Sequence, residues 1–493
     1  MNAHFVRDNR MKHVFLPTLF GAVAALGGFL VHAASGVAAN YVGDARDDLI
    51  IGAPGEAPGW SPRSGLVFLL RGGAAGMVGA AAIDQTGLGA NEAGDEFGAA
   101  LAAGDFDGDR DHDLAIGAPG ESLGDSSRSG AVFVQLGGGA GLTPDAVLDQ
   151  RGIGADEEGD RFGATLAAGD FNGDGFDDLA VGAPNEAPGS SPISGGVFVF
   201  LGSASWLVPQ RFFDQAGLGV NELGDRFGAA LCVGDFDGDG RDDLAIGAPG
   251  EAPGSDPSSG AVYVFRGTAQ GLAPDRVLDQ DGLGANEEDD GFGSALASGD
   301  FNGDGADELA VGAPGEAPGS DPKSGGVFVF RGTSEGLEPR NFVAQDGLGV
   351  NETGDDFGRA LSSGDYDGDG FDDLAVGAPG ESPGPDPRSG AVYVFRGSGA
   401  NLLPEQFVTQ AELSANESGD RFGAALASGN YVGNHRDDLV VGAPGEAPWS
   451  DPSSGAVFLF RGTASGLLPQ QFVTQLKLGA NEAGDRFGAA LCE

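Results

Sequence analysis

The chain has 493 residues, of which 91 are glycine and 27 are proline, and its 74 acidic against 26 basic residues give a formal charge of −48. This much glycine disfavours a helical protein, since each glycine in a helix interior costs about 1 kcal/mol, while 32 phenylalanines and 40% hydrophobic residues oppose disorder. The charge disfavours binding to nucleic acid or to anionic lipid and makes divalent cations natural partners, so we expect a turn-rich all-β protein.

The first 33 residues differ in composition from the rest. Arg7, Arg10 and Lys12 precede an apolar run over 14–31, and small residues then lead to Ala33. This pattern is typical of a secretory signal peptide, so we predict one over residues 1–33, with Met11 as an alternative start. The protein is then secreted or at the cell surface, in an extracellular or periplasmic space, with no membrane span after cleavage. An uncleaved membrane anchor is the alternative.

A repeat of 65 residues fills the remainder of the chain. Seven units counted back from Glu493 begin at Ala39, which predicts one repeat domain over residues 39–493. Phe-Gly recurs at Phe97, Phe162, Phe227, Phe292, Phe357, Phe422 and Phe487, and Gly-Ala-Pro recurs at Gly52, Gly117, Gly182, Gly247, Gly312, Gly377 and Gly442.

Each unit predicts four short strands, which in one copy are residues 227–233, 244–247, 261–265 and 276–280. One such sheet cannot bury both of its faces, so we predict a seven-bladed β-propeller in which the sheets pack face to face. Residues 485–493 repeat the first strand that the first unit lacks, so the C-terminal strand should complete the first blade and close the ring. An open solenoid is the alternative.

A nine-residue loop follows the first strand of each unit. In five loops (105–113, 170–178, 235–243, 300–308 and 365–373) oxygen side chains stand at positions 1, 3, 5 and 9. Glycines at position 4, and mostly at 6, let the chain curl, and the carbonyl of position 7 can add a ligand. An all-oxygen site suits Ca²⁺ better than Mg²⁺ or a soft metal, so we predict about five calcium sites.

The expected ligands are Asp105, Asp107, Asp109, Asp111, Asp113, Asp170, Asn172, Asp174, Phe176, Asp178, Asp235, Asp237, Asp239, Arg241, Asp243, Asp300, Asn302, Asp304, Ala306, Glu308, Asp365, Asp367, Asp369, Phe371 and Asp373, those at position 7 through the backbone carbonyl. Solvated acidic turns are the alternative. An EF-hand is excluded because its position 12 would be Ile116, inside a strand pattern. Glu308 puts the geometry of its own loop in doubt.

Two loops depart from this pattern. Val42 replaces the acidic residue at position 3 of loop 40–48, and Val432 and Asn434 replace those at positions 3 and 5 of loop 430–438. We predict that neither loop holds calcium well.

Phe-Gly, the aspartate loop and Gly-Ala-Pro, in this order and in seven copies, resemble the FG-GAP repeat and the seven-bladed propeller of integrin alpha subunits and their bacterial relatives. The resemblance implies that the oxygen side chains of the five intact loops are calcium ligands, and that partners bind on the face opposite these loops. Nothing follows the last unit, so integrin legs, a transmembrane helix, a catalytic domain and pairing with a beta subunit are not expected.

These features favour a monomeric interaction or adhesion module that binds a protein or carbohydrate ligand. The strand order places the calcium loops on one face and the longest turns, such as 247–259 and 282–290, on the other. Trp60 and Trp449 lie in such turns of the first and seventh blades and form a speculative ligand-binding pair; two unrelated tryptophans are the alternative.

Two other functions stay open. A calcium-dependent hydrolase or lyase is disfavoured because only His112 and His435 remain after the signal and no catalytic motif is present; a Ser-rich turn at 125–129 matches a metal-site string by coincidence. A structural surface or matrix component is the third hypothesis. Cys232 and Cys492 occupy one repeat position in two units and are expected to be packed core residues.

Overall fold

The computed structural model describes residues 41, 46–56, 63–123, 127–138, 141–154, 157–188, 193–253, 257–284, 286–318, 323–345, 347–447, 455–474 and 491. The predicted signal peptide, Trp60, Trp449 and Cys492 lie outside these residues. Among the residues that the structure describes, no helix has the length and apolar character needed to span a bilayer.

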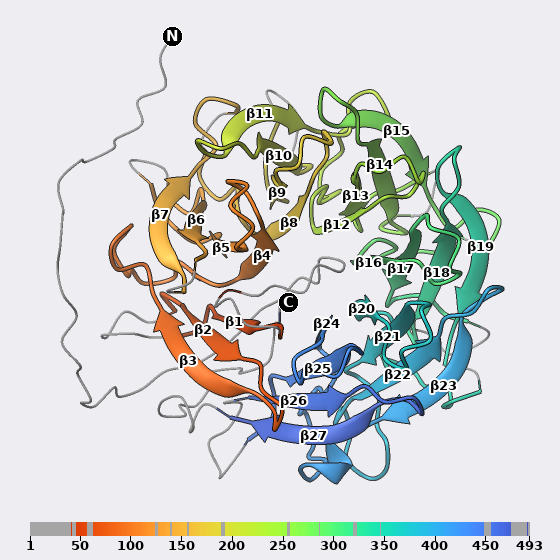
Figure 1. Ribbon diagram of the computed structural model, residues 1–493. Helices are drawn as coiled ribbons and strands as arrows, with labels where there is room; N and C mark the ends of the chain where they lie inside the picture. Colours follow the sequence, from red (N-terminus) through yellow and green to blue (C-terminus); the bar gives the residue numbers. More distant parts are fainter. Residues whose placement is uncertain are drawn as a thin grey trace, which may run out of the picture.

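Seven antiparallel sheets form a ring, and each is a blade of a β-propeller (Figure 1). In every blade the strands pair in sequence order, as the repeat predicts. Blade 1 holds β1 (Leu49–Ala53), β2 (Leu66–Arg71) and β3 (Val78–Ile83); blade 2 holds β4 (Ala100–Gly104), β5 (Asp113–Ala118), β6 (Ala131–Leu136) and β7 (Thr143–Leu148); blade 3 holds β8 (Thr165–Gly169), β9 (Asp178–Ala183), β10 (Gly196–Leu201) and β11 (Val208–Phe213).

Blade 4 holds β12 (Ala230–Gly234), β13 (Asp243–Ala248), β14 (Ala261–Arg266) and β15 (Ala273–Leu278); blade 5 holds β16 (Ala295–Gly299), β17 (Glu308–Ala313), β18 (Gly326–Arg331) and β19 (Glu338–Val343). Blade 6 holds β20 (Ala360–Gly364), β21 (Asp373–Ala378), β22 (Ala391–Arg396) and β23 (Leu403–Val408); blade 7 holds β24 (Ala425–Gly429), β25 (Asp438–Ala443), β26 (Ala456–Arg461) and β27 (Leu468–Val473). A short 3-10 helix, η2 (Gln410–Glu412), joins blades 6 and 7.

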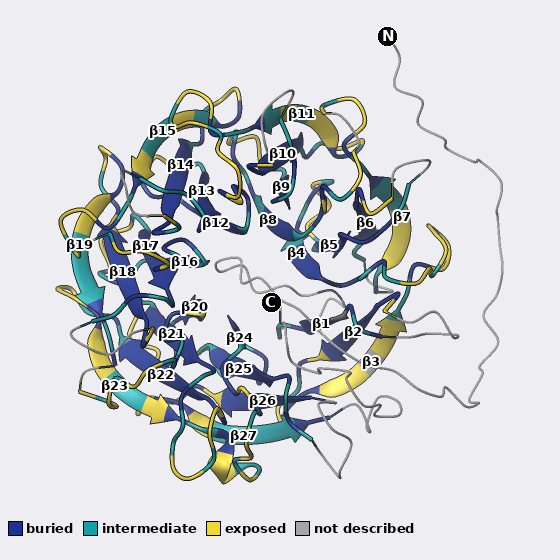
Figure 2. Cartoon of the chain, turned by 180° about the vertical axis from the view of Figure 1, so that it is seen from behind, coloured by how far each residue is buried: buried dark blue, intermediate teal, exposed yellow. Residues whose placement is uncertain are grey.

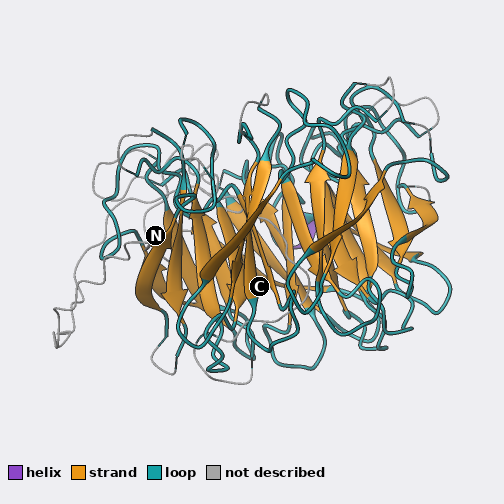
Figure 3. Cartoon of the chain, turned by 90° about the horizontal axis from the view of Figure 1, so that it is seen from above, coloured by secondary structure: helices purple, strands orange, loops and turns teal. Residues whose placement is uncertain are grey.

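The first strand of each four-stranded blade lies nearest the axis and the fourth at the rim (Figure 1). Figure 2 shows the inner strands buried and the rim strands partly exposed: β13 is buried throughout, whereas only the last residue of β15 is buried. Seen from the side, the strands lie between two layers of loops (Figure 3). The predicted all-β propeller is confirmed.

Two predicted strand positions are wrong by a few residues. The first strand of blade 4 begins at Ala230 because Phe227 instead bridges Gly195 of the preceding blade. The fourth begins at Ala273 rather than 276, because a register shift after Val264 lets the strand continue through Pro274 at the rim.

The repeated glycines are explained by contacts between blades. Gly293, of a Phe-Gly pair, donates its N–H to the carbonyl of Gly312 in its own blade at 3.1 Å. On its other side lies Gly247 of blade 4, where an added Cβ would stand 2.1 Å from the Gly293 carbonyl oxygen. The Phe-Gly and Gly-Ala-Pro motifs therefore meet at the joint between two blades, where main chain touches main chain.

The hydrophobic core lies between blades. One cluster joins Cys232 and Val262 of blade 4 to Phe292, Val311 and Phe328 of blade 5. Phe292 is fully buried and meets Phe328 edge to face, with ring centroids 5.4 Å apart. Cys232 is a packed core residue, as expected. Successive sheets are therefore held together largely by apolar burial.

The ring is closed. The N–H of Asn430 in blade 7 donates to Asp47 Oδ2 of blade 1 at 2.6 Å, and Gln471 exchanges hydrogen bonds with the backbone of Met77 at 2.8 and 3.0 Å. Leu491, the one described residue of the C-terminal segment, is fully buried in a cluster with Leu49 and Ile51. Its position in the cluster matches that of Leu231 in blade 4, in agreement with a C-terminal strand completing blade 1.

Candidate metal centres

The five intact loops share one fold, built around the carboxylate at position 1. In loop 170–178, Asp170 accepts hydrogen bonds from the N–H groups of Gly173, Asp174 and Gly175 at 2.8, 3.1 and 2.8 Å. Both glycines have positive φ, 73° and 86°, which favours glycine there. The sequence predicts that this curl turns the side chains of alternate positions toward one point.

The residue at position 9 is buried in all five loops. Asp178 Oδ1 accepts from the N–H of Gly202, at 2.8 Å, which ties the loop to the turn between strands three and four. The other oxygen, Oδ2, has no hydrogen-bond partner among the described residues, and the same is true of Glu308 Oε2. A buried carboxylate oxygen without a donor needs compensation, which a cation would supply.

Carboxylate oxygens converge in these loops. One oxygen from each of Asp105, Asp107 and Asp113 lies within 4.8 Å of the others, and the same holds for Asp235, Asp237 and Asp239. Because calcium binds oxygens at 2.3–2.6 Å, ligands on opposite sides of an ion are about 4.6–5.2 Å apart. The residues present therefore fit a calcium ion in their chemistry, and their oxygens are close enough together to bind one ion.

Burial raises the pKa of the position-9 carboxyls well above their ordinary range, to about 7 for Asp113 and Glu308 and about 8 for Asp178, Asp243 and Asp373. Neighbouring carboxylates raise them further. In the metal-free protein these groups hold protons near neutral pH, so protons and a divalent cation compete for the same oxygens.

This competition gives a pH dependence with a defined sign. Because the folded-state pKa values lie above those of the unfolded chain, the metal-free protein binds more protons when folded, and the resulting stability is lost as pH rises through about 7 to 8. In EDTA we expect the melting temperature to fall between about pH 6 and 8.5. In millimolar calcium, which binds deprotonated ligands, the trend should weaken or reverse. Thermal melts in both buffers measure this; equal slopes would contradict it.

Arginines enter three of the loops, which the sequence analysis did not anticipate. Each comes from the end of strand three: Arg266 lies 2.9 Å from Asp237, Arg331 pairs with Asp304, and Arg396 lies 3.5 Å from Asp369. At the equivalent position blades 2 and 3 have Leu136 and Leu201. Counting these arginines together with Arg110 and Arg241 within the loops, loops 235–243 and 300–308 keep the least uncompensated negative charge. We therefore expect these two loops to bind calcium more weakly than the other three.

A further aspartate, at position 8 of the loops of blades 3–7, joins its loop to that of the preceding blade. The N–H of Asp105 donates to Asp177 Oδ2 at 2.8 Å, and that of Asp170 donates to Asp242 Oδ2 at 2.8 Å. Such aspartates line an axial cavity of about 340 Å³, namely Asp177, Asp242, Asp307, Asp372 and Asp437. They hold neighbouring loops in place; their invariance in blades 3–7 was the signal available in the sequence.

Loop 430–438 is held by neutral groups instead. Val432 is a core residue in the cluster with Ile51, and Asn434 Nδ2 donates to the Gly462 carbonyl at 3.0 Å. Asp438 is retained because it accepts from the N–H groups of Val432 and Gly462. The expectation that this loop does not hold calcium stays a prediction. In loop 40–48, residues 42–45 lie outside the described residues.

Asp239→Ala tests one site alone. Asp239 is partly exposed and its carboxylate meets Arg241 at 3.0 Å, so its removal costs little packing. We expect one bound calcium fewer per chain, by equilibrium dialysis with elemental analysis, and an unchanged far-ultraviolet spectrum. Unfolding, or loss of every ion together, would contradict independent sites.

Comparison with known proteins agrees with this architecture. A family model described as FG-GAP repeat matches residues 97–134, 162–200, 227–265, 292–330 and 357–395, which are the first three strands of blades 2–6 with their intact loops. The chain is 36% identical over 173 residues to a rat phosphatidylinositol-glycan-specific phospholipase D, covering 34% of this chain and 20% of the relative. It is 37% identical over 181 residues to integrin alpha-PS5 of Drosophila melanogaster, covering 36% of this chain and 16% of that protein.

The chain thus spans about a fifth or less of the length of these relatives. Among solved structures, a protein from Lactobacillus plantarum is similar with a TM-score of 0.49 at 14% identity, covering 91% of this chain and 98% of the other.

Proposed function

Because the chain is an FG-GAP repeat β-propeller that resembles the propeller of integrin alpha subunits, we propose that it is a secreted or surface-exposed interaction module whose five aspartate loops are stabilised by calcium. The converging carboxylates of those loops, and the buried oxygens of Asp178 and Glu308 that lack donors, support the calcium. The ligand should bind the face opposite the loops.

The observation that supports this face is a local break in the repeat. At the position of Ile193 the described units have Arg63, Arg128, Ser258, Lys323 and Arg388, and at the position of Leu223 they have Ala93, Glu158, Glu288, Thr353 and Ser418. In blade 3 and its connection to blade 4 both positions carry large apolar side chains, whereas elsewhere the first is polar and the second is polar or alanine.

The apolar side chains are exposed and close to one another in the fold. Ile193 is 48% exposed, Leu223 is 76% exposed and nearby Val220 is 67% exposed. The N–H of Gly224 donates to the Ile193 carbonyl at 2.9 Å, which places the two segments side by side. They belong to a strand-two-to-three turn and a connection between blades, whereas the calcium loops contact the turns between strands three and four.

Scaffold constraint does not account for exposed, large apolar side chains at the positions of Ile193 and Leu223, which are polar or alanine elsewhere. Val220 lies beside Leu223, at a position that is alanine or, at Val350, another exposed valine in the other units. Such residues are typical of contacts with a protein partner. We call Ile193, Val220 and Leu223 the apolar patch and propose that it contacts an extracellular protein.

The test is binding to arrays of immobilised extracellular-matrix proteins and glycans, with and without calcium. Ile193→Arg with Leu223→Glu restores the residues of other blades, so it should fold normally and lose binding at least tenfold. Val208→Glu is the matched control, since Val208 is 51% exposed at the rim and Glu338 occupies its position in blade 5. Retained binding in the double variant would reject the patch, and retention of glycans alone would favour a carbohydrate ligand.

A calcium-dependent hydrolase or lyase is the competing function. It predicts turnover of a polysaccharide or ester substrate without stable retention on the array. If the wild-type protein releases product, and the double variant releases it equally well, the enzyme is favoured over the interaction module.

A further inference from the structure

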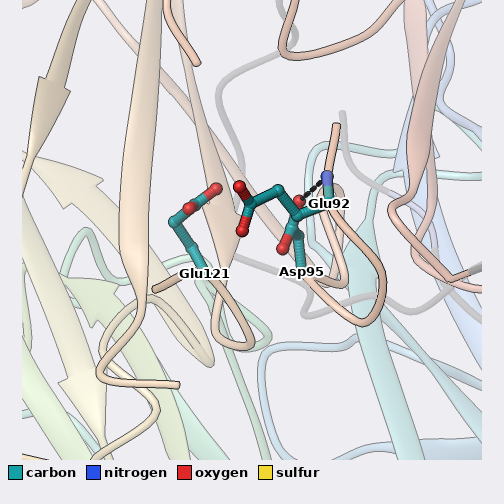
Figure 4. Close-up of side chains that lie close together, drawn as sticks. All are labelled: Glu92, Asp95 and Glu121. Atoms are coloured by element: carbon teal, nitrogen blue, oxygen red, sulfur yellow. Dashed lines mark hydrogen bonds between the residues drawn. The ribbon is translucent and has the colours of Figure 1, made fainter. Parts of the chain in front are cut away.

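A second set of acidic residues lies on the face opposite the aspartate loops, at the seams between blades. Glu92 and Asp95, from the connection that follows blade 1, face Glu121, which follows β5 of blade 2 (Figure 4). One oxygen of each lies within 4.8 Å of the others. Asp95 and Glu121 are buried and Glu92 is exposed, so the group is open to solvent on one side only.

The same arrangement recurs around the ring. The structure brings together Glu157, Asp160 and Glu186 at the next seam, and Glu222, Asp225 and Glu251 at the one after. In each, the N–H of the first glutamate donates to the aspartate, as Glu92 does to Asp95 Oδ2 at 2.6 Å. We call each such trio, with the glutamine described next, a seam cluster.

A buried glutamine completes every seam cluster. Gln85 is 1% exposed, and its Nε2 donates to Glu121 Oε2 at 3.2 Å, which places the amide group against the carboxylates. Its Oε1 has no hydrogen-bond partner among the described residues. The same oxygen lacks a partner in the six equivalent glutamines: Gln85, Gln150, Gln215, Gln280, Gln345 and Gln410.

The fourth seam shows the lack of partners most clearly. Gln280 is fully buried, and neither its amide oxygen nor its amide nitrogen has a partner. Glu316, at the position of Glu121, is 8% exposed and its Oε2 also lacks a partner. A buried acceptor without a donor is destabilising, so its repetition in six units indicates a ligand common to all of them.

The donor set defines what that ligand is. Three carboxylates and an amide oxygen are hard ligands with an excess of negative charge, which excludes an anion and disfavours a soft metal. One oxygen from each carboxylate lies close enough to the others for one divalent cation to bind all three. Lysine or arginine side chains do not serve as counter-ions here: none forms an ion pair with Asp95 or Glu121 in the described residues.

Tyrosines supply a comparison within the molecule. Tyr263 donates to Glu251 Oε2 at 2.9 Å and Tyr393 donates to Glu381 Oε2 at 2.7 Å, so at these two seams that oxygen already has a hydroxyl donor. Elsewhere phenylalanine stands in the same place, at Phe133, Phe198, Phe328 and Phe458. The seams with phenylalanine have the greater need for a cation.

We propose that the seam clusters bind divalent cations, with Ca²⁺ as the ion that fits best, and so form a second ring of metal sites on the face opposite the aspartate loops. Each ion would fasten the connection after one blade to the turn between strands two and three of the next. This proposal does not rest on the function proposed above.

The test counts ions on the full chain in millimolar calcium. We expect more than five bound ions, and a loss of one when the first seam, which has Phe133 in place of a tyrosine, is neutralised by Asp95→Asn with Glu121→Gln. The matched control is Glu335→Gln with Glu338→Gln, which removes the same charge from exposed residues that are ligands in neither kind of site and should leave the count unchanged.

A crystal of the wild-type protein grown in calcium provides a second measurement that needs no variant. Anomalous difference peaks at the seam clusters would support the proposal. Five or fewer ions, all in the aspartate loops, or water alone at the seams, would overturn it; so would an unchanged ion count in the seam variant. Because Asp239→Ala affects only an aspartate loop, failure of the seam sites and failure of the loop sites are distinguishable.

Discussion

Removal of calcium with EDTA should lower the melting temperature by roughly 7 °C. Extracellular calcium sites have dissociation constants near ~10⁻⁴ M, so each site adds about 1.4 kcal/mol at about 1 mM free ion. Five loops then contribute on the order of 7 kcal/mol, as much as the whole stability of a typical domain. Unfolding entropy of about 2 cal/mol/K per residue over the repeat domain converts this to the stated shift.

The measurement is a calorimetric melt in calcium, in EDTA, and in EDTA with calcium restored in excess. Recovery in the third sample is the control that excludes damage by the chelator. An unchanged melt in EDTA, with no metal detected by elemental analysis, would reject a stabilising role for the loops.

Gly247→Ala should destabilise the protein by about 3 kcal/mol or more, the upper range for overpacked sites. The added Cβ would lie 2.1 Å from the carbonyl oxygen of Gly293 in the next blade. Main-chain atoms on both sides are fixed by sheet hydrogen bonds, so the blades must separate to accept the methyl group. Urea unfolding followed by fluorescence measures the loss.

Gly399→Ala is the matched control, because a Cβ at Gly399 meets no atom within 4 Å. It should leave stability within about 0.5 kcal/mol of the parent, as expected for a surface change. Equal effects of the two substitutions would show that the backbone preference of glycine over alanine, rather than contact between blades, determines the loss in free energy of unfolding.

The fold could be predicted because its repeat is strict. A period of 65 residues places each strand, loop and glycine without knowledge of contacts, and the complementary ends predict closure. The prediction has two errors in strand position. The first arises from a neighbouring blade, because Phe227 pairs with Gly195 of the preceding blade. The second lies at the rim, where the fourth strand can include Pro274 because no further strand requires its N–H.

The candidate metal loops could also be predicted, since their ligands are close in sequence and of one chemical kind. The arginines at Asp237 and Asp304, and the seam clusters, could not be assigned in this way. In both cases the partners are 30 or so residues apart, as Glu92 and Glu121 are. The arginines and their aspartates belong to one blade, whereas the seam clusters join two. Their periodicity was visible, but only packing shows that they meet.

The main-chain contact between Gly247 and Gly293 determines which residues of the propeller tolerate substitution. Because main-chain atoms fix the distance between adjacent blades, solvent-facing side chains have no part in setting the size of the ring. The surface residues of a single blade can therefore be substituted, as at Ile193 and Leu223, without preventing closure of the seven-bladed ring.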